Sequence, residues 1–297
     1  MHQFAVQQQV VEIDGIRIGG RIGENPPVMI GSIFYRGHDV VTDPGAGEFD
    51  RPKTEDLINR QEELSDVTGL PAMYDVVASS PKAAASFLEF VAGRTRKPLL
   101  FDPIGDEAAL KGLEYIGEVG LEERIIFNSI NPETKDVIMK SLQSNKIKFA
   151  VLLTYSMKAL TSSGERVNLA KYLLVKARQA GIEKTLVDTV VIDPPTLGLA
   201  SNAIFEVKDK LGVPAGCGAH NAISQLESKL GAKSGVGCAT SACVIPATLG
   251  ADFVLYGPIE YAEFMFPAVA LVGVAYRQLY VESGGKLETG RPRLRIV

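Results

Sequence analysis

Four short apolar runs in this chain end in a carboxylate or a carboxamide. They read LLFD, IIFN, VVID and AGCGAHN, and they end at Asp102, Asn128, Asp193 and Asn221. Short apolar runs bounded by polar residues are typical of buried strands. In a barrel of parallel strands the carboxyl ends meet at one rim, which is where the chemistry takes place. We therefore expect these four side chains to share one site.

Two acids and two amides suit a ligand with a guanidine-like donor edge. A carboxylate accepts two parallel hydrogen bonds from such an edge, as it does from arginine. Amides donate as well as accept, so they can serve other ring atoms. The 2-amino group and N3–H of a pterin form an edge of this kind. Asp75 is a further candidate for the same site, with a turn-closing role as the alternative.

The order of the expected elements predicts how these residues are positioned. After an opening hairpin-like segment (VVEID, Gly15, IRIGG), eight strands are expected at Val28 to Tyr35, Ala72 to Val77, Pro98 to Asp102, Arg124 to Ser129, Phe149 to Tyr155, Thr189 to Asp193, Pro214 to His220 and Asp252 to Tyr256. Segments with helical periodicity lie between them at Thr54 to Asp66, Pro81 to Ala92, Glu107 to Val119, Glu133 to Ser144, Val167 to Ala180 and Ser201 to Leu211. This alternation predicts an α/β protein, a (β/α)8 TIM barrel with a short N-terminal hairpin-like extension.

Length and composition fit a single barrel domain over residues 1–297. The chain has 297 residues, 46% of them hydrophobic, which is enough for one large core. Its 31 Lys and Arg residues are outnumbered by 35 Asp and Glu residues, so a nucleic-acid surface is not expected. The start, MHQFAVQQQVVEIDG, lacks a secretory pattern, and three cysteines form no disulfide framework. We expect a cytoplasmic protein.

One apolar segment near the end of the chain bears on membranes and on assembly. Phe264 to Tyr276 contains Pro267 and is shorter than the roughly 20 residues that a spanning helix needs. No membrane span is therefore expected. The same apolar segment makes a homodimer plausible, since it offers a face for a second copy.

Longer stretches of the sequence resemble a known family. The segments GENPPVMIGSIFYRGHDVV, INRQEELSDVTG, YDVVASSP, FNSINPET and DPPTLG are similar to those of the H subunit of tetrahydromethanopterin S-methyltransferase and its bacterial relatives. The resemblance covers nearly the whole chain. It implies a pterin-binding TIM barrel that moves a methyl group between a tetrahydropterin and a corrinoid-bound cobalt. It also implies that the cobalamin is supplied by a corrinoid protein as partner.

The resemblance also implies roles for the strand-end residues. In the wider set, which includes methyltetrahydrofolate:corrinoid/iron-sulfur protein methyltransferase, the pterin site has an acid after the third strand, Asn after the fourth, Asp after the sixth and Asn after the seventh. The matching positions here are Asp102, Asn128, Asp193 and Asn221. The third-strand acid is often followed by Ser or Thr, whereas Pro103 follows Asp102 here.

Within this site, Asn221 is the expected catalytic residue. Methyl transfer is a displacement that needs no covalent protein nucleophile, so the protein's tasks are alignment and control of charge at pterin N5. An amide can donate to N5 or accept from protonated N5 by flipping, and a permanent carboxylate cannot. Asp102 and Asp193 are expected to hold the donor edge and Asn128 the ring amide side. The expected substrates are tetrahydrofolate and protein-bound methylcobalamin.

Several alternatives stay open at this level. One is a tetrahydromethanopterin-specific subunit of a larger complex, which need not turn over alone. A second is an enzyme similar to dihydropteroate synthase, although the basic residue expected after its seventh strand is absent from CGAHNA. A third is a zinc thiol methyltransferase using Cys217 and His220, but strand alternation places these two side chains on opposite faces. No metal site is predicted.

Other rim residues have two readings each. Asp and Asn at strand ends also cap the helix that follows. Phe34, Tyr155 and Tyr256 either stack on the pterin or fill the top of the barrel, and Tyr35, Ser129 and Thr154 complete the expected rim. His38 either faces a corrinoid partner or lies in a solvated loop, and His220 is a rim histidine with no acid spaced to orient it.

Overall fold

Eight parallel strands form a closed barrel in the computed structural model, which describes residues 4–182, 184–223 and 231–286. Each strand pairs with the next along the chain, and the last pairs with the first. The barrel strands are β3 (Val28–Ile33), β6 (Ala72–Ala78), β7 (Leu99–Pro103), β8 (Ile125–Ile130), β9 (Phe149–Leu153), β10 (Lys184–Asp188), β11 (Ala215–Gly218) and β12 (Phe253–Pro258). The predicted (β/α)8 barrel is confirmed.

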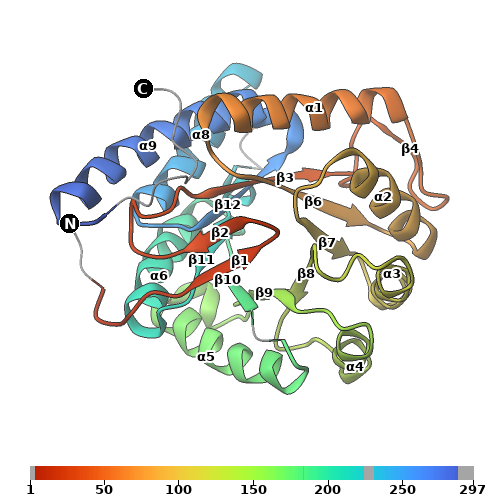
Figure 1. Ribbon diagram of the computed structural model, residues 1–297, viewed down its shortest axis with the longest axis horizontal. Helices are drawn as coiled ribbons and strands as arrows, with labels where there is room; N and C mark the ends of the chain where they lie inside the picture. The colour runs from red at the N-terminus through yellow and green to blue at the C-terminus, as the bar shows by residue number, and fades with distance from the viewer. Residues whose placement is uncertain (1–3, 183, 224–230, 287–297) are drawn as a thin grey trace.

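Helices surround the barrel and lie between consecutive strands (Figure 1). They are α1 (Arg51–Thr68), α2 (Pro81–Arg94), α3 (Asp106–Val119), α4 (Asp136–Ser144), α5 (Ser163–Gln179), α6 (Pro194–Leu211), α8 (Ala232–Thr248) and α9 (Ala262–Glu282). The short 3-10 helices η1 (Ala159–Thr161), η2 (Ala219–Ala222) and η3 (Ile259–Tyr261) follow β9, β11 and β12, and the small antiparallel pair β4 (Val41–Asp43) and β5 (Glu48–Phe49) precedes α1. Side-chain caps at Asp50 and Ser80, each followed by proline in the first turn, explain where α1 and α2 begin.

An N-terminal hairpin closes one end of the barrel. Strands β1 (Val10–Ile13) and β2 (Ile16–Gly19) pair in antiparallel fashion, and Figure 1 shows them lying across the strand ends. Their apolar side chains, including Ile13 and Ile18, join one buried cluster with Ile30, Met73 and Leu100 of the barrel. Burial of such a side chain stabilises by about 1.5 to 3 kcal/mol. The hairpin fills the amino end of the barrel, so the carboxyl end is the one left for a ligand.

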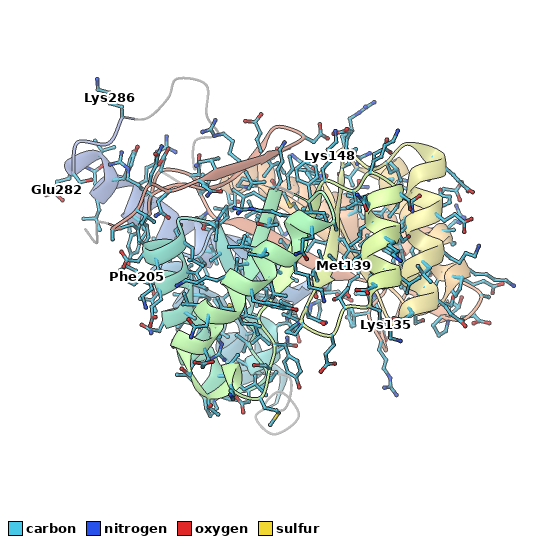
Figure 2. All side chains as sticks on the ribbon, turned by 90° about the horizontal axis from the view of Figure 1, so that it is seen from below. Lys135, Met139, Lys148, Phe205, Glu282 and Lys286 are labelled. Carbon is cyan, nitrogen blue, oxygen red and sulfur yellow. The ribbon has the colours of Figure 1, made fainter. Side chains whose placement is uncertain are left out.

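The side view separates the two ends of the barrel (Figure 2). Lys148, just before β9, lies on the side of the hairpin, and Lys135, which precedes α4, lies on the opposite side. Loops that follow the strands therefore gather around the end opposite the hairpin, which we call the barrel mouth.

Four strands end earlier than the sequence predicted: β3 and β9 by two residues each, and the sixth and seventh strands, which bear on the site. The sixth barrel strand is Lys184–Asp188, so the predicted strand Thr189 to Asp193 is wrong by five residues. Asp193 instead begins α6, because its carboxylate caps the helix and two prolines follow it. The seventh strand ends at Gly218 and not at His220, which lies in η2.

The last helix is longer than its sequence pattern predicted. Among the described residues, one stretch, Ile259–Glu282, is long and apolar enough by these two measures to cross a membrane, with a mean hydropathy of 1.4. The apolar segment is therefore not too short to span a membrane, contrary to the prediction from Phe264 to Tyr276. Met265, Phe266 and Val269 are buried, and α9 packs on α1 and α8, whereas Leu271 is 66% exposed. The homodimer stays a prediction.

Candidate functional site

A cavity of about 460 Å³ opens at the barrel mouth. It is lined by the carboxyl ends of strands from most of the barrel and by the loops that follow them. We call it the mouth pocket; its polar lining residues are Ser32, Tyr35, Asp75, Asp102, Asn128, Ser129, Asp188, His220, Asn221 and Tyr261. Of the five predicted site residues, the pocket brings together Asp75, Asp102, Asn128 and Asn221, and it leaves out Asp193.

Asp75 lies at the floor of the pocket and is almost fully buried. Ser32 Oγ donates to its Oδ2 at 2.8 Å, and Asn128 Nδ2 donates to its Oδ1 at 3.1 Å. Burial raises the pKa of Asp75 to about 6, although these two hydrogen bonds oppose the shift. The bond to Asn128 fixes the orientation of that amide, so its oxygen is left for another partner.

Asp102 lies nearer the opening than Asp75. In the β6–β7 register Asp75 pairs with Leu100, and Asp102 pairs with Val77, two residues further along each strand. Burial raises the pKa of Asp102 well above its usual range, and the negative charge of Asp75 raises it further. Ionisation of Asp75 therefore disfavours ionisation of Asp102. A ligand that donates hydrogen bonds to both carboxylates would favour their charged forms.

Asp188 is the sixth-strand acid that the sequence analysis missed. It is the last residue of β10 and 6% exposed, and its Oδ1 accepts from Val190 N–H at 2.8 Å. Burial raises its pKa to about 6, opposed by backbone hydrogen bonds from Val190 and Gly218. The negative charge of Asp75 raises this pKa as well. Asp188 thus occupies the place predicted for Asp193.

Asp193 serves the helix instead. Its Oδ1 accepts from Thr196 N–H at 2.9 Å, and the Thr196 hydroxyl accepts from Asp193 N–H at 3.0 Å, which together form a capping box. The side chain is not part of the mouth-pocket lining. At Asp193 the alternative prediction is therefore correct: this acid caps the helix that follows.

His220 and Asn221 reach the pocket from η2. His220 Nδ1 lies 3.3 Å from the carbonyl oxygen of Leu255, which can only accept, so Nδ1 carries the proton in this contact. Burial lowers the pKa of His220. Gly257, at φ +89°, allows the approach, because a Cβ there would lie 2.6 Å from His220 Cβ. Asn221 is exposed at the pocket edge.

A buried histidine supports the aromatic wall of the pocket. His38 is 2% exposed, so neither predicted placement, facing a partner or in solvent, is correct. Its Nδ1 accepts from Phe34 N–H at 2.9 Å, so the proton is on Nε2, which lies 2.9 Å from Glu260 Oε1. Burial would raise the pKa of Glu260, but His38 and Tyr35 hold it below its usual value. Tyr35 stacks on His38 and donates to Glu260 at 3.2 Å.

Four other predicted rim residues do not line the pocket. Phe34 stacks on Phe87 at 4.0 Å, and Tyr256 packs near Phe266, both in the layer between barrel and helices. Tyr155 is 42% exposed on the loop after β9, and Thr154 is buried with its hydroxyl donating to Asp188 O. The aromatic residues that line the pocket are instead Tyr35 and Tyr261.

The described residues hold no group of three or more His, Cys, Asp or Glu side chains that is arranged to bind a metal ion. Cys217 is fully buried on the outer side of β11, in the cluster that also contains Cys243, whereas His220 lines the pocket. The two side chains are placed apart, as predicted, but not by strand alternation, because His220 lies in η2 beyond the end of β11.

Comparison with known proteins identifies the family. A family model described as "Tetrahydromethanopterin S-methyltransferase MtrH subunit" matches residues 6–286. The chain is 35% identical over 311 aligned positions to the H subunit of tetrahydromethanopterin S-methyltransferase from Methanothermobacter marburgensis, covering 100% of both chains. The chain belongs to the MtrH family. The resemblance seen in the sequence is confirmed.

Other MtrH-family relatives are similar over most of their length. The corresponding protein of Methanothermobacter thermautotrophicus is 37% identical, with 92% of this chain and 93% of the relative covered. The H subunit of the putative methyltransferase mtx from Methanosarcina mazei is 33% identical over 91% and 92%. The prediction of a tetrahydropterin methyltransferase is confirmed at the level of the family. The two Methanothermobacter relatives are named for tetrahydromethanopterin, which was the alternative to tetrahydrofolate.

Solved structures similar to this MtrH-family chain are dihydropteroate synthases. The Yersinia pestis enzyme with a pterin–sulfa conjugate has a TM-score of 0.63 and 13% identity, with 90% of this chain and 99% of that chain covered. The Xanthomonas albilineans enzyme has a TM-score of 0.61 and 12% identity, with 91% and 98% covered. At this identity the likeness shows the barrel fold alone.

The position of Asp188 was nevertheless readable in the sequence. The run TLVD also ends in an acid, five residues before VVID. The pair of prolines after Asp193 is typical of a helix start, because proline lacks the N–H that the first turn leaves unpaired. A helix beginning at Pro194 requires the strand to end earlier. Ser32 gave no such signal, because its role depends on contact with Asp75 from the neighbouring strand.

Proposed function

We propose that this chain transfers a methyl group between a corrinoid held by a partner protein and N5 of a tetrahydropterin. The observation that supports this most is the mouth pocket of an MtrH-family barrel, which is lined by three carboxyl groups, Asp75, Asp102 and Asp188, and by an amide that Asp75 orients. Carboxyl groups in such a pocket suit a ligand that donates hydrogen bonds, because a carboxylate taken out of water needs donors to replace the water.

The size and the chemistry of the pocket both suit a pterin. Its volume of about 460 Å³ lies within the range of small-molecule sites, roughly 300 to 1,000 Å³. Asp102 and Asp188 are the candidates for the 2-amino and N3–H edge, since each lies at the end of a strand that lines the opening. Asn128, held by Asp75 from below, is placed for the ring carbonyl and N–H side.

Asn221 is the proposed catalytic residue. Methyl transfer is an in-line displacement between cobalt and N5, so alignment and control of charge at N5 are what the protein supplies. The amide lies at the exposed edge of the pocket, where N5 of a pterin bound by its opposite edge would face the incoming partner. It orients the N5 lone pair in one direction and stabilises protonated N5 in the other.

A protein partner has an apolar surface to bind beside the pocket. Five exposed apolar side chains lie on the loops after β7 to β10 and on the first turn of α4: Ile104, Val137, Tyr155, Met157 and Ile192. Met157 is the most exposed of them, at 77%. Several exposed apolar side chains on the loops around one pocket are typical of a surface that binds another protein. We therefore propose that the corrinoid protein docks over these loops.

Tetrahydromethanopterin is the better supported substrate, because the relatives over the full chain are named for it. Tetrahydrofolate, which the sequence predicted, has the same reacting N5. The distinguishing experiment supplies methylcob(III)alamin with each pterin under anaerobic conditions and records the absorbance of Co(I). We expect Co(I) with tetrahydromethanopterin at the higher kcat/KM. A higher value with tetrahydrofolate would reverse the choice, and no Co(I) with either would contradict catalysis by this chain.

A charge on the proposed docking surface should separate binding of the partner from chemistry. We expect Met157→Glu to lower kcat/KM for a methylated corrinoid protein by about tenfold, because a carboxylate replaces an apolar contact worth about 1 to 2 kcal/mol. Turnover with free methylcobalamin should not change, since Met157 does not line the mouth pocket. Val119→Glu is the control, because Val119 is 48% exposed at the end of α3, away from the mouth. Equal losses with both methyl donors would refute the docking surface.

A further inference from the structure

Arg166 is a fully buried cation that contacts backbone rather than an acid. It lies on α5 and is 0% exposed. Its Nε–H donates to Thr189 O at 2.6 Å and its Nη2–H donates to Val190 O at 3.4 Å. Among the ion pairs of the described residues none includes Arg166, and its Nη1 has no hydrogen-bond partner. Burial of such a cation is costly, so its position calls for an explanation.

The two carbonyls that Arg166 contacts belong to the turn directly after Asp188. Val190 has φ +51°, a conformation that costs a β-branched residue about 1 to 3 kcal/mol. In this conformation Val190 N–H donates to Asp188 Oδ1 at 2.8 Å. Thr189 fixes the other side of the turn, because its hydroxyl donates to Ala200 O at 3.0 Å. Arg166 thus stabilises a strained turn, and this turn orients the Asp188 carboxylate.

The charge of Arg166 also acts on Asp188. The titratable groups around this carboxylate are Asp75 on β6, Cys217 on β11 and Arg166 on α5, with Asp102 and His220 further round the same pocket. Asp75 raises the pKa of Asp188, and the guanidinium of Arg166 lowers it. Burial raises the pKa of the Cys217 thiol and lowers that of His220, so both are neutral near pH 7. The cation on α5 therefore offsets the acid on β6.

We propose that Arg166 is a positioning residue: it holds the Thr189–Val190 turn and keeps the Asp188 carboxylate charged and aimed at the donor edge of the ligand. The identity of that ligand as a tetrahydropterin rests on the proposed function. Arg166 does not line the mouth pocket, so it acts through Asp188 and not by contact with the substrate.

The test compares Arg166→Met and Arg166→Lys with the wild type and with Lys176→Met. Lys176 is a matched control, because it lies on the same helix and its Nζ donates to backbone carbonyls, including Thr134 O at 2.7 Å. Carbon-13 NMR of labelled aspartate carboxyls, with Asp188 assigned by its loss in Asp188→Asn, follows the titration of that group. Dissociation constants for tetrahydromethanopterin and tetrahydrofolate are then measured from pH 5 to 9.

Arg166→Met should raise the Asp188 titration midpoint, by up to about one pH unit, since it removes a cation that lowers this pKa. The pterin dissociation constant should then rise by up to about fivefold near pH 6 and hardly at all at pH 9, where Asp188 is ionised in both proteins. Arg166→Lys should keep the midpoint near that of the wild type, and Lys176→Met should not move it.

Two results would overturn the proposal: an unchanged Asp188 midpoint in Arg166→Met, or a loss of affinity equal at every pH, as for a purely structural residue. If Arg166→Met does not fold, Arg166→Gln takes its place: a raised Asp188 midpoint in that variant supports the role, and an unchanged midpoint with an equal loss of affinity at all pH values refutes it. Wild-type protein that binds neither pterin would refute the proposed function, whereas the NMR midpoints would still decide the role of Arg166.

Discussion

Replacement of Asn221 by Ala should lower kcat by about a hundredfold or more and leave pterin affinity within about threefold of the wild type. The amide is proposed to act on N5, where charge changes during the transfer, and loss of one such hydrogen bond costs about 3 kcal/mol in the transition state. The acids and the amide that hold the other edge of the pterin are unchanged in this variant. Steady-state kinetics with free methylcobalamin, together with equilibrium titration of the pterin, measure the two quantities separately.

Two further variants sharpen the assignment of Asn221. Asn221→Asp should also be slow above neutral pH, because a carboxylate accepts but cannot donate to N5. Asn202→Ala is the matched control, since Asn202 is an exposed asparagine on α6 whose amide pairs with Glu206. If Asn221→Ala raises only KM and keeps kcat, Asn221 binds the pterin and is not catalytic.

Replacement of Asp188 by Asn should weaken pterin binding by about tenfold to a hundredfold at pH 7. The change removes one charge-assisted acceptor of the donor edge, a contact worth about 1.5 to 3 kcal/mol. Asp193→Asn should leave affinity unchanged, because Asp193 caps α6 and Asn caps a helix about as well as Asp. Isothermal titration of both variants decides between the two acids. A larger loss in Asp193→Asn would restore the original assignment.

The same Asp188→Asn variant should gain stability while it loses affinity. The folded pKa of Asp188, about 6, lies above the unfolded value of 3.8, so the folded state holds its proton more tightly. The stability that this proton provides is present below pH 4 and is lost as the pH rises through 6. A neutral amide avoids that loss, which is about 2 to 3 kcal/mol at pH 7. Thermal unfolding should therefore show a higher midpoint for Asp188→Asn than for the wild type at pH 7 and little difference at pH 4.

Much of the fold could be predicted because its signals are local. Apolar runs of about five to seven residues separated by amphipathic segments specify strands and helices through propensity and periodicity, and Asp50 and Ser80 mark helix starts through short-range hydrogen bonds. Of the predicted site residues, Asp75, Asp102, Asn128 and Asn221 line the mouth pocket, and their role in binding a pterin stays a prediction. Asp193 lies outside the pocket, because it caps α6. The acid that ends the strand is Asp188, five residues earlier, where another apolar run ends.

The sequence by itself determined the order of strands and helices, the hairpin before them and the polar character of the strand ends, because each of these is encoded in patterns of residues close together in the chain. Only the tertiary structure decided which polar groups meet. Burial in the barrel mouth, with a smaller contribution from the charge of Asp75, raises the pKa of Asp188. Asp75 also orients Asn128, and Arg166 reaches the Asp188 turn from a neighbouring helix. These effects depend on burial and on distances across the closed barrel, which no local pattern encodes.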